Sequence, residues 1–365
     1  MTAPQPPSSS SHSLDNLRPE ELRLAKGTET TPEQRAAFFA RTHPRLVPWL
    51  APHWNWWFRI GFRPEVEPIV AVARDQLVGH AGTLPFVFRH GEELQTAVWY
   101  LVFAVLPECQ GHGLGKKLTE EWMRLCPNPI TECNEKSISI FKKYGWEETF
   151  DTRRLAFVAA PARLAAHRPK ALQIALSLGQ PLYRAWMKWC SRSAPEITPG
   201  PVGQTPQSMS DLFQTEPAAQ LELIRDSDWI SWRVLQSPFL HEYRLFRCES
   251  AVALVRGFVS DGVRRLHILY LNASNAREQS LLVRGIIRWA CDDHADLIWA
   301  VARSSALIKS LRANLPSEIG VRIAAYNNDK QLMNLFLRPG FQLQAIDTDI
   351  DLSHAEDPGT HFLWD

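Results

Sequence analysis

One stretch decides how the rest of the chain is interpreted. It is Val105-Leu106-Pro107-Glu108-Cys109-Gln110-Gly111-His112-Gly113-Leu114-Gly115-Lys116. The apolar run before it, Val98 to Leu106, predicts a strand, and the amphipathic segment Leu114 to Leu125 predicts a helix. Glycines between them allow positive φ and leave room for a ligand above the backbone. The first amides of a helix lack internal partners, and the helix dipole adds about half a positive charge there. The bend therefore predicts a cradle for a phosphate or diphosphate group.

A short glycine bend is a weak signal by itself, because many such bends are only tight turns. The Walker pattern G-x-x-x-x-G-K-[ST] is not present between Gly111 and Lys117. The dinucleotide pattern G-x-G-x-x-G does not fit the spacing of Gly111, Gly113 and Gly115 either. What remains is Gln-x-x-Gly-x-Gly, preceded by Val105-Leu106-Pro107-Glu108.

This combination resembles the acetyl-coenzyme A loop of the GNAT acyltransferase family, in which V-x-P-E is followed by Q/R-x-x-G-x-G/A and a helix. A second stretch resembles the family's pattern N-x-x-A-x-x-x-Y-x-K-x-G-F. It runs from Asn134-Glu135-Lys136-Ser137 to Phe141-Lys142-Lys143-Tyr144-Gly145-Trp146. One position departs, because Phe141 stands where the family usually has tyrosine. The resemblance implies an α+β fold with a mixed, largely antiparallel central sheet flanked by helices.

The resemblance also implies a cofactor, acetyl-CoA or another acyl-CoA, and no metal. It implies that the strand before the loop diverges from the next strand, Ile130 to Cys133, and that the gap holds the pantetheine arm. The residues implied in cofactor binding are Phe103, Val105, Gln110, Gly111, His112, Gly113, Leu114, Gly115, Lys116, Asn134, Phe141 and Lys143.

Composition limits the class of protein. With 365 residues, 45% of them apolar and 22% charged, the chain is globular and long enough for two domains. A net charge of +1 provides no field for nucleic acid. The six cysteines form no C-x-x-C pair, so we expect reduced thiols in the cytoplasm. Cys109, beside the loop, has no histidine arrangement that would make it a nucleophile. Residues 1–20 lack the apolar core of a secretory signal, and no apolar run is long enough to span a membrane.

The order of elements predicts two similar halves. Residues 1–21 are rich in proline and serine and should form a loose tail. Residues 22–158 form the predicted catalytic domain, 159–208 a basic helical connector with a proline-rich linker, 209–352 a degenerate GNAT-like domain, and 353–365 a second tail. The later half repeats the element order and places Gly340-Phe341 where Gly145-Trp146 falls earlier. It has no glycine between Asn272 and Gln279, so we expect it to be structural or to shape the acceptor site. Its last strand is predicted over Gln342 to Asp347.

Two apolar features have alternative interpretations. Trp54, Trp57 and Phe58 share one helical face and either form core or line the acceptor pocket. Residues 153–194 contain no acidic side chain and interleave arginine and lysine with leucine and tryptophan. This segment is either a connector whose apolar stripe packs between domains or a peripheral contact with an anionic membrane.

Aminolysis of a thioester needs a base for the amine, a polarised carbonyl and a proton for the leaving thiolate. Glu132, Glu108 and His80 are the candidate bases. The family's usual proton donor is the tyrosine replaced by Phe141, so Tyr144 is the candidate substitute, with water as the alternative.

The sequence therefore predicts an acyl-CoA-dependent N-acyltransferase, in particular an N-acetyltransferase acting on a small-molecule amine, such as an amino sugar. A catalytically weak acyl-CoA-binding sensor or scaffold is the alternative, favoured by Phe141. An aminoacyl or long-chain acyl transferase is the third, and the intact loop disfavours an aminoacyl-tRNA donor. The oligomeric state stays open.

Overall fold

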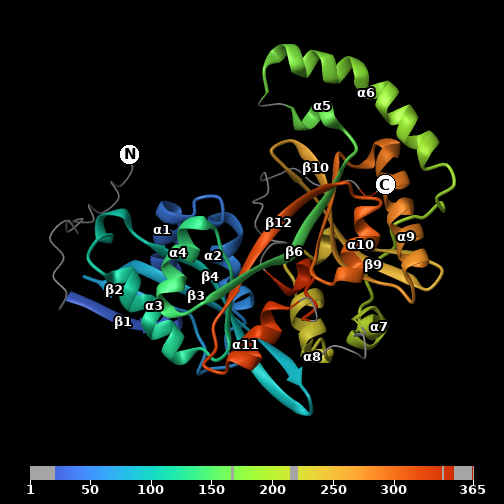
Figure 1. Ribbon diagram of the computed structural model, residues 1–365. Coiled ribbons are helices and arrows are strands. Elements are labelled where there is room, and N and C mark those ends of the chain that lie inside the picture. Colours follow the sequence, from blue (N-terminus) through green and yellow to red (C-terminus); the bar gives the residue numbers. More distant parts are fainter. Residues whose placement is uncertain (1–20, 166–167, 214–220, 339–340, 349–363, 365) are drawn as a thin grey trace, which may run out of the picture. The chain divides into compact units, whose positions relative to one another are not determined.

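The computed structural model describes residues 21–165, 168–213, 221–338, 341–348 and 364 (Figure 1). The two predicted tails lie outside these residues, apart from Glu21 and Trp364. The chain divides into two compact units. Unit 1 comprises Met1–Leu84 and Tyr100–Pro127, and unit 2 comprises Pro85–Trp99 and Asn128–Asp365. The domain boundaries inferred from the repeat of elements stay a prediction.

In unit 1 the strand order is β1-β2-β3-β4, and helices accompany the sheet. The strands are β1 (Leu22–Lys26), β2 (Ile69–Ala73), β3 (Gln76–His90) and β4 (Glu93–Val105), of which β3 and β4 continue into unit 2. The helices are α1 (Pro32–Thr42), α2 (Val47–Trp57) and α3 (Leu114–Leu125). The strands β1, β2 and β3 are antiparallel, with Leu24 opposite Ala71 and Val70 opposite His80.

The helix starts of unit 1 follow from local sequence. Thr31 caps α1 by accepting from the Gln34 amide at 3.2 Å, and the Gln34 side chain accepts from the Thr31 amide at 2.9 Å. The stretch Thr31-Pro32-Glu33-Gln34 predicts a helix start, with a capping threonine and proline at the first helical position. The reciprocal capping confirms this start of α1. The predicted helix at Leu114–Leu125 is also confirmed. It lies close to the sheet because Trp122 Nε1 donates to Gly82 O at 3.1 Å.

Unit 2 contains a sheet with the strand order β5-β12-β6-β11-β10-β9-β8. Its pairs are antiparallel except β10 with β11. The strands are β5 (Pro129–Glu132), β6 (Glu147–Val158), β7 (Leu221–Leu223), β8 (Tyr243–Cys248), β9 (Ala251–Ser260), β10 (Val263–Asn272), β11 (Leu297–Ala302) and β12 (Ser317–Ala325). Strand β7 pairs with the end of β3, at Phe88 to His90. The predicted mixed, largely antiparallel sheet flanked by helices is confirmed.

Strand β12 lies between β5 and β6, although it is distant from both in sequence. Ile323 is opposite both Glu132 of β5 and Thr149 of β6. A strand from the predicted second domain thus joins two strands of the predicted first domain. Strand β5 also pairs in parallel with β4, at Val98–Pro129 and Trp99–Ile130. The predicted divergence of these two strands beyond that point stays a prediction.

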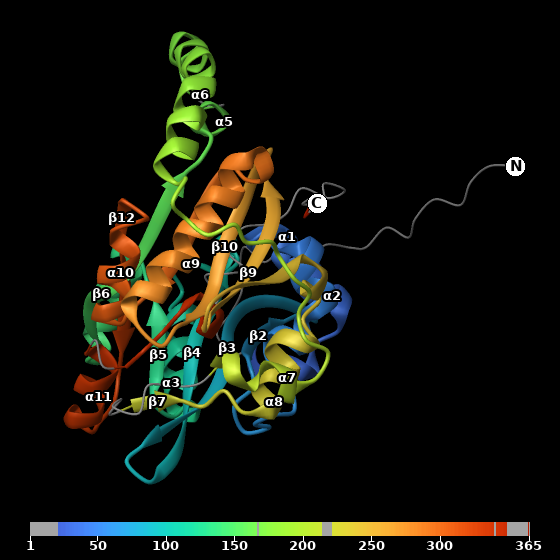
Figure 2. The same cartoon turned by 90° about the vertical axis from the view of Figure 1, so that its right-hand side faces the viewer.

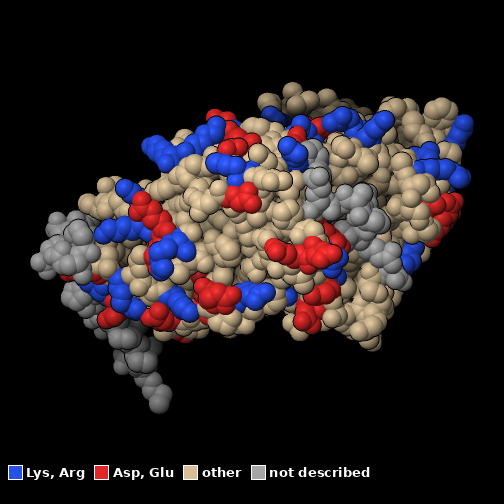
Figure 3. All heavy atoms as spheres, turned by 60° about the horizontal axis from the view of Figure 1, so that its bottom comes forward, with Lys and Arg blue, Asp and Glu red and all other residues tan. Residues whose placement is uncertain are grey.

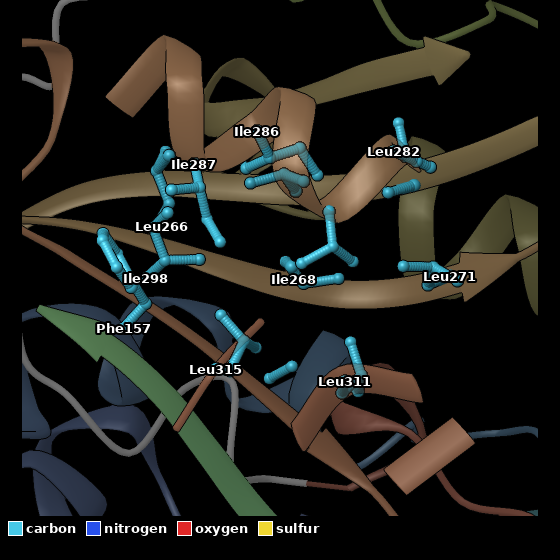
Figure 4. Close-up of a cluster of buried hydrophobic side chains, with 14 of the residues drawn as sticks. Phe157, Leu266, Ile268, Leu271, Leu282, Ile286, Ile287, Ile298, Leu311 and Leu315 are labelled. Atoms are coloured by element: carbon cyan, nitrogen blue, oxygen red, sulfur yellow. The ribbon is translucent and has the colours of Figure 1, made fainter. Parts of the chain in front are cut away.

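The helices of unit 2 are α4 (Glu135–Phe141), α5 (Pro161–Leu164), α6 (Lys170–Cys190), α7 (Pro206–Ser210), α8 (Ser227–Ile230), α9 (Ala276–Trp289), α10 (Ser305–Arg312) and α11 (Lys330–Leu337). Figure 2 shows α9 running along strands β9 and β10. The core between the sheet and helices α9 and α10 contains leucine and isoleucine side chains from both, among them Leu266, Ile268, Ile286 and Leu311 (Figure 4).

One expectation for the C-terminal region was wrong, because the strand expected over Gln342 to Asp347 is a 3₁₀ turn, Ala345–Asp347. Sequence reasoning also missed helix α11. Gln344 keeps a single antiparallel bridge to Ala302, and its side chain bonds to β10, where its Oε1 accepts from the Leu271 amide at 2.8 Å and its Nε2 donates to Leu271 O at 3.1 Å. The Gly340 of the predicted repeat lies outside the described residues.

Candidate functional site

The glycine loop of unit 1 is anchored to the end of β4. The Leu106 amide donates to Val78 O at 2.9 Å, and a 3₁₀ turn, Pro107–Cys109, follows. The Gln110 side chain then turns back, and its Nε2 donates to Val105 O at 3.0 Å. As the sequence predicted, Gly111 and Gly113 have positive φ, +83° and +75°. The motif glutamine and both glycines therefore have structural reasons for their positions.

Helix α3 begins directly after Gly113, and its first amides are available. Its hydrogen-bond ladder starts with Lys117 N donating to Gly113 O at 3.1 Å, and Gly113 provides no side-chain cap. No described residue accepts from the amides of residues 111–116. A Cβ placed on Gly111 or on Gly113 would meet no atom within 4 Å. The bend thus combines backbone donors that have no acceptor among the described residues with open space beside its two glycines.

Phe103 lies beside the first turn of α3. A Cβ on Gly115 would lie 3.4 Å from Phe103 Cζ, which is ordinary van der Waals contact, so the ring lies directly against this turn. The ring packs at 5.5 Å from that of Tyr100 and is partly exposed. Lys116 and His112 are exposed, and Leu114 is buried in the unit 1 core. Unit 1 thus brings together Phe103, Val105 and residues 110–116 of the predicted cofactor set.

Glu108, a predicted base, forms an ion pair with Arg41 of α1. The Arg41 Nη2 lies 2.7 Å from Glu108 Oε1 and 2.8 Å from Oε2. Both carboxylate oxygens of Glu108 are therefore engaged by the Arg41 guanidinium. The interaction instead ties α1 to the turn before the glycine loop.

His80 is buried in an aromatic cage and bonded to a strained backbone. Its Nδ1 donates to Val102 O at 2.7 Å, and Val102 has φ of +49°, which is rare for a β-branched residue. The surrounding rings belong to Phe38, Phe39, Trp54 and Phe58. The core interpretation of Trp54, Trp57 and Phe58 is confirmed, since all three are buried.

The environment of His80 makes it unsuitable as a base. Burial lowers its pKa from 6.5 to about 3, and the nearby positive groups His43 and Arg35 act in the same direction, against the bond to Val102 O. Its Nε2 is buried and has no hydrogen-bond partner among the described residues. His80 is therefore neutral and holds the bend of β4 at Val102. Sequence reasoning missed Val102, because nothing about a valine indicates positive φ.

The second group of predicted residues lies in unit 2, along one continuous strand, helix and turn. Glu132 ends β5, and Asn134 caps α4 by accepting from the Lys136 and Ser137 amides at 2.9 and 3.0 Å. Phe141 is buried with its ring 4.7 Å from that of Trp146. Tyr144 lies half-buried in the 3₁₀ turn Lys142–Tyr144, and Lys143 is exposed. The two groups of predicted site residues thus belong to different compact units.

The two cysteines nearest the motifs, Cys109 and Cys133, are poor nucleophiles. Burial raises the pKa of the Cys109 thiol and raises that of Cys133 to about 12. All six cysteines are free. Within the described ranges, no cluster of His, Cys, Asp or Glu side chains could hold a metal ion. On the face drawn in Figure 3, Lys and Arg side chains are interspersed with Asp and Glu.

Comparison with known proteins places this geometry in a family. The model of the "Acetyltransferase (GNAT) family" matches residues 29–146, which include the loop and the second motif. No curated protein matches the chain.

Similar solved structures share the fold at low sequence identity. One is a GCN5-related N-acetyltransferase from Kribbella flavida, 16% identical, with a TM-score of 0.53 over 83% of this chain and 71% of that one. Another is a putative acetyltransferase from Pyrococcus horikoshii, 12% identical, with a TM-score of 0.50 over 87% and 94%. The N-myristoyltransferase of Saccharomyces cerevisiae, with bound myristoyl-CoA, is 8% identical, with a TM-score of 0.52 over 84% and 78%. The chain therefore carries, at residues 29–146, an acyltransferase domain of the GNAT family.

Proposed function

We propose that the chain transfers an acetyl group from acetyl-CoA to a small-molecule amine. The observation that carries the proposal is the bend at Gly111 and Gly113, where backbone amides of the α3 start have no acceptor among the described residues. Such a helix start favours an anion, and the diphosphate of coenzyme A is one. The family match at residues 29–146 supports the same cofactor.

The proposed binding residues follow the two motifs. In unit 1 these are Phe103, Val105 and residues 110–116, and the second motif contributes Asn134, Phe141 and Lys143. Gln110 shapes the loop through its bond to Val105 O, so its side chain supports the cradle rather than contacting the anion. We place the reaction in the cytoplasm, in keeping with six free cysteines.

The reaction requires an amine that has lost its proton. The amine lone pair forms the C–N bond at the thioester carbonyl, and the C–S bond breaks with its electron pair on sulfur. The nitrogen then loses a proton to give the amide, and the thiolate takes up a proton. An aliphatic ammonium has a pKa near 10, so a base or water must remove a proton first. We assign this role to Glu132 ahead of Glu108, because Arg41 occupies the carboxylate of Glu108. Tyr144 is the proposed proton donor to the thiolate.

Phe141 favours a second candidate, an acyl-CoA-binding sensor with weak catalysis. Its buried ring cannot donate a proton where the family usually has a phenol. The two candidates predict the same binding and differ in turnover. The acyl group is also open to test, since one protein of similar fold was solved with myristoyl-CoA.

A thermal-shift titration with acetyl-CoA, myristoyl-CoA and free coenzyme A tests the binding. Acetyl-CoA at a hundred times its dissociation constant should add about 2.7 kcal/mol to the free energy of unfolding. Thiol release with a panel of amines, including amino sugars, then separates enzyme from sensor. Binding without turnover on any amine supports the sensor.

Gly113→Glu tests the assigned cradle. We expect it to abolish the acetyl-CoA shift, because it places a carboxylate where the diphosphate would bind. Gly262→Glu is the matched control, since Gly262 also has positive φ, +71°, and open space around a Cβ. An acetyl-CoA shift that persists in Gly113→Glu would refute the site.

A further inference from the structure

Helix α6 is attached to unit 2 through polar contacts. Tyr183 donates its hydroxyl to Val158 O at 2.6 Å, and Gln180 Nε2 donates to Ala159 O at 3.1 Å. Lys188 pairs with Asp292 at 2.6 Å, and Met187 adds an apolar contact with the core. These residues recur at helical spacing and share one side of α6. The helix is therefore held in one orientation.

The opposite side of α6 is apolar and exposed. The large side chains on it, here called the apolar stripe, are Ile174, Leu178, Leu182, Trp186 and Trp189. Their spacing of three and four residues places them on one face. Leu178 and Leu182 are each 76% exposed, and none of the helix residues is buried. An ordinary surface helix turns its apolar face toward the core, so α6 has the reverse arrangement.

The charges around the stripe are of one sign. Residues 152–195 contain no acidic side chain. Three exposed cations at the ends of α6 have no ion-pair partner among the described residues. They are Arg168 and Lys170 near the start of the helix and Arg192 after its end. Arg192 lies with Cζ 4.7 Å from the centroid of the Trp189 ring. Figure 1 shows α6 outside the sheet and helices of its own unit.

We propose that the apolar stripe of α6 binds the surface of an anionic membrane. Leucine and isoleucine would enter the boundary between headgroups and acyl chains. Tryptophan is enriched at that depth, where its ring is apolar and its N–H is hydrated. The cationic residues at both ends would contact anionic headgroups. In the described part of the chain no helix is long and apolar enough to span a bilayer, so the contact is peripheral. The proposal does not depend on the proposed acetyl transfer.

Vesicle flotation with the full chain tests the proposal. We expect the protein to float with vesicles of phosphatidylcholine and phosphatidylserine, and much less with phosphatidylcholine alone. Leu178→Gln/Leu182→Gln should reduce the partition coefficient at least about tenfold, because two leucines no longer enter the apolar layer. The melting temperature should not change, since both positions are exposed. Arg168→Glu/Lys170→Glu should weaken flotation with the anionic vesicles.

The matched control is Leu94→Gln/Ile319→Gln. These side chains are 61% and 63% exposed and belong to unit 2 outside α6, so this variant should float like the wild type. Failure of the wild type to float with anionic vesicles would overturn the proposal. Equal flotation of Leu178→Gln/Leu182→Gln and Leu94→Gln/Ile319→Gln would overturn it as well. Light scattering tests the alternative that a second copy of the chain covers the apolar stripe. In that case the wild type would be a dimer that does not float, and Leu178→Gln/Leu182→Gln would be a monomer. This result would refute membrane binding.

Discussion

Acidification should destabilise the protein through His80. The folded pKa of this buried imidazole is lowered to about 3, whereas an exposed histidine in the unfolded chain has a pKa of 6.5. Between these values the unfolded state binds a proton that the folded state does not. The stabilising contribution of His80 is therefore complete above pH 6.5 and is lost progressively as the pH falls toward 3. The loss is about 1.4 kcal/mol per pH unit, or about 2 kcal/mol between pH 6.5 and 5.

His80→Asn isolates this effect. The asparagine amide can donate to Val102 O as Nδ1 does, but it does not titrate. At pH 7.5 the variant should be less stable, because the smaller side chain leaves part of the aromatic cage empty. Below pH 6.5 the difference in the free energy of unfolding between the wild type and His80→Asn should narrow, by about 1.4 kcal/mol per pH unit. Burial also lowers the pKa of His43, but that residue is present in both proteins and cancels in the difference.

Urea unfolding followed by tryptophan fluorescence measures both proteins without ligand from pH 7.5 to 5. Trp54, whose ring centroid is 5.1 Å from that of His80, reports on the region. His112→Asn is the matched control, because His112 is exposed, and it should keep the wild-type dependence on pH. If His80→Asn and the wild type lose stability in parallel as the pH falls, the burial of a neutral His80 is refuted.

Three further predictions concern named contacts. The buried Arg225 has its Nε and Nη2 2.9 and 2.7 Å from the Asp347 carboxylate. Asp347→Asn removes this counter-charge and should lower the free energy of unfolding in urea by about 3–5 kcal/mol. A loss below about 1 kcal/mol would contradict this prediction. Glu132→Gln should lower kcat about 10²-fold or more with little change in the KM for acetyl-CoA, and Glu108→Gln should lower it less; the reverse order would reassign the base. Thr31→Ala should cost about 1 kcal/mol through the lost cap of α1, and an unchanged unfolding midpoint would count against the cap.

The parts of the fold that the sequence predicted are those set by local chemistry. Thr31 and Pro32 mark the start of α1, and the positive φ at Gly111 and Gly113 follows from residue type. The clustering of the first motif in unit 1 follows as well, since those residues are contiguous or lie on the preceding strand. The assignment of their roles in binding stays a prediction.

The parts that could not be predicted depend on distant partners. Nothing local to Ser317–Ala325 indicates that it pairs with β5 and β6. The expected strand near residue 344 is reduced to one bridge between Gln344 and Ala302, while the Gln344 side chain bonds to the distant Leu271. Likewise the amphipathicity of α6 was visible in the sequence, whereas the choice of its polar side for attachment depends on Val158, Ala159 and Asp292.

The insertion of β12 between β5 and β6 has a consequence for biosynthesis. While the ribosome is still making the later residues, β5 and β6 lack the strand that joins them, and their unpaired backbone edges are exposed to other nascent chains. Such long-range pairing is slow, because the intervening polypeptide must be ordered first. The nascent chain is therefore most vulnerable to misassembly until residue 325 has left the exit tunnel, and a chaperone that shields these edges would raise the yield of native protein.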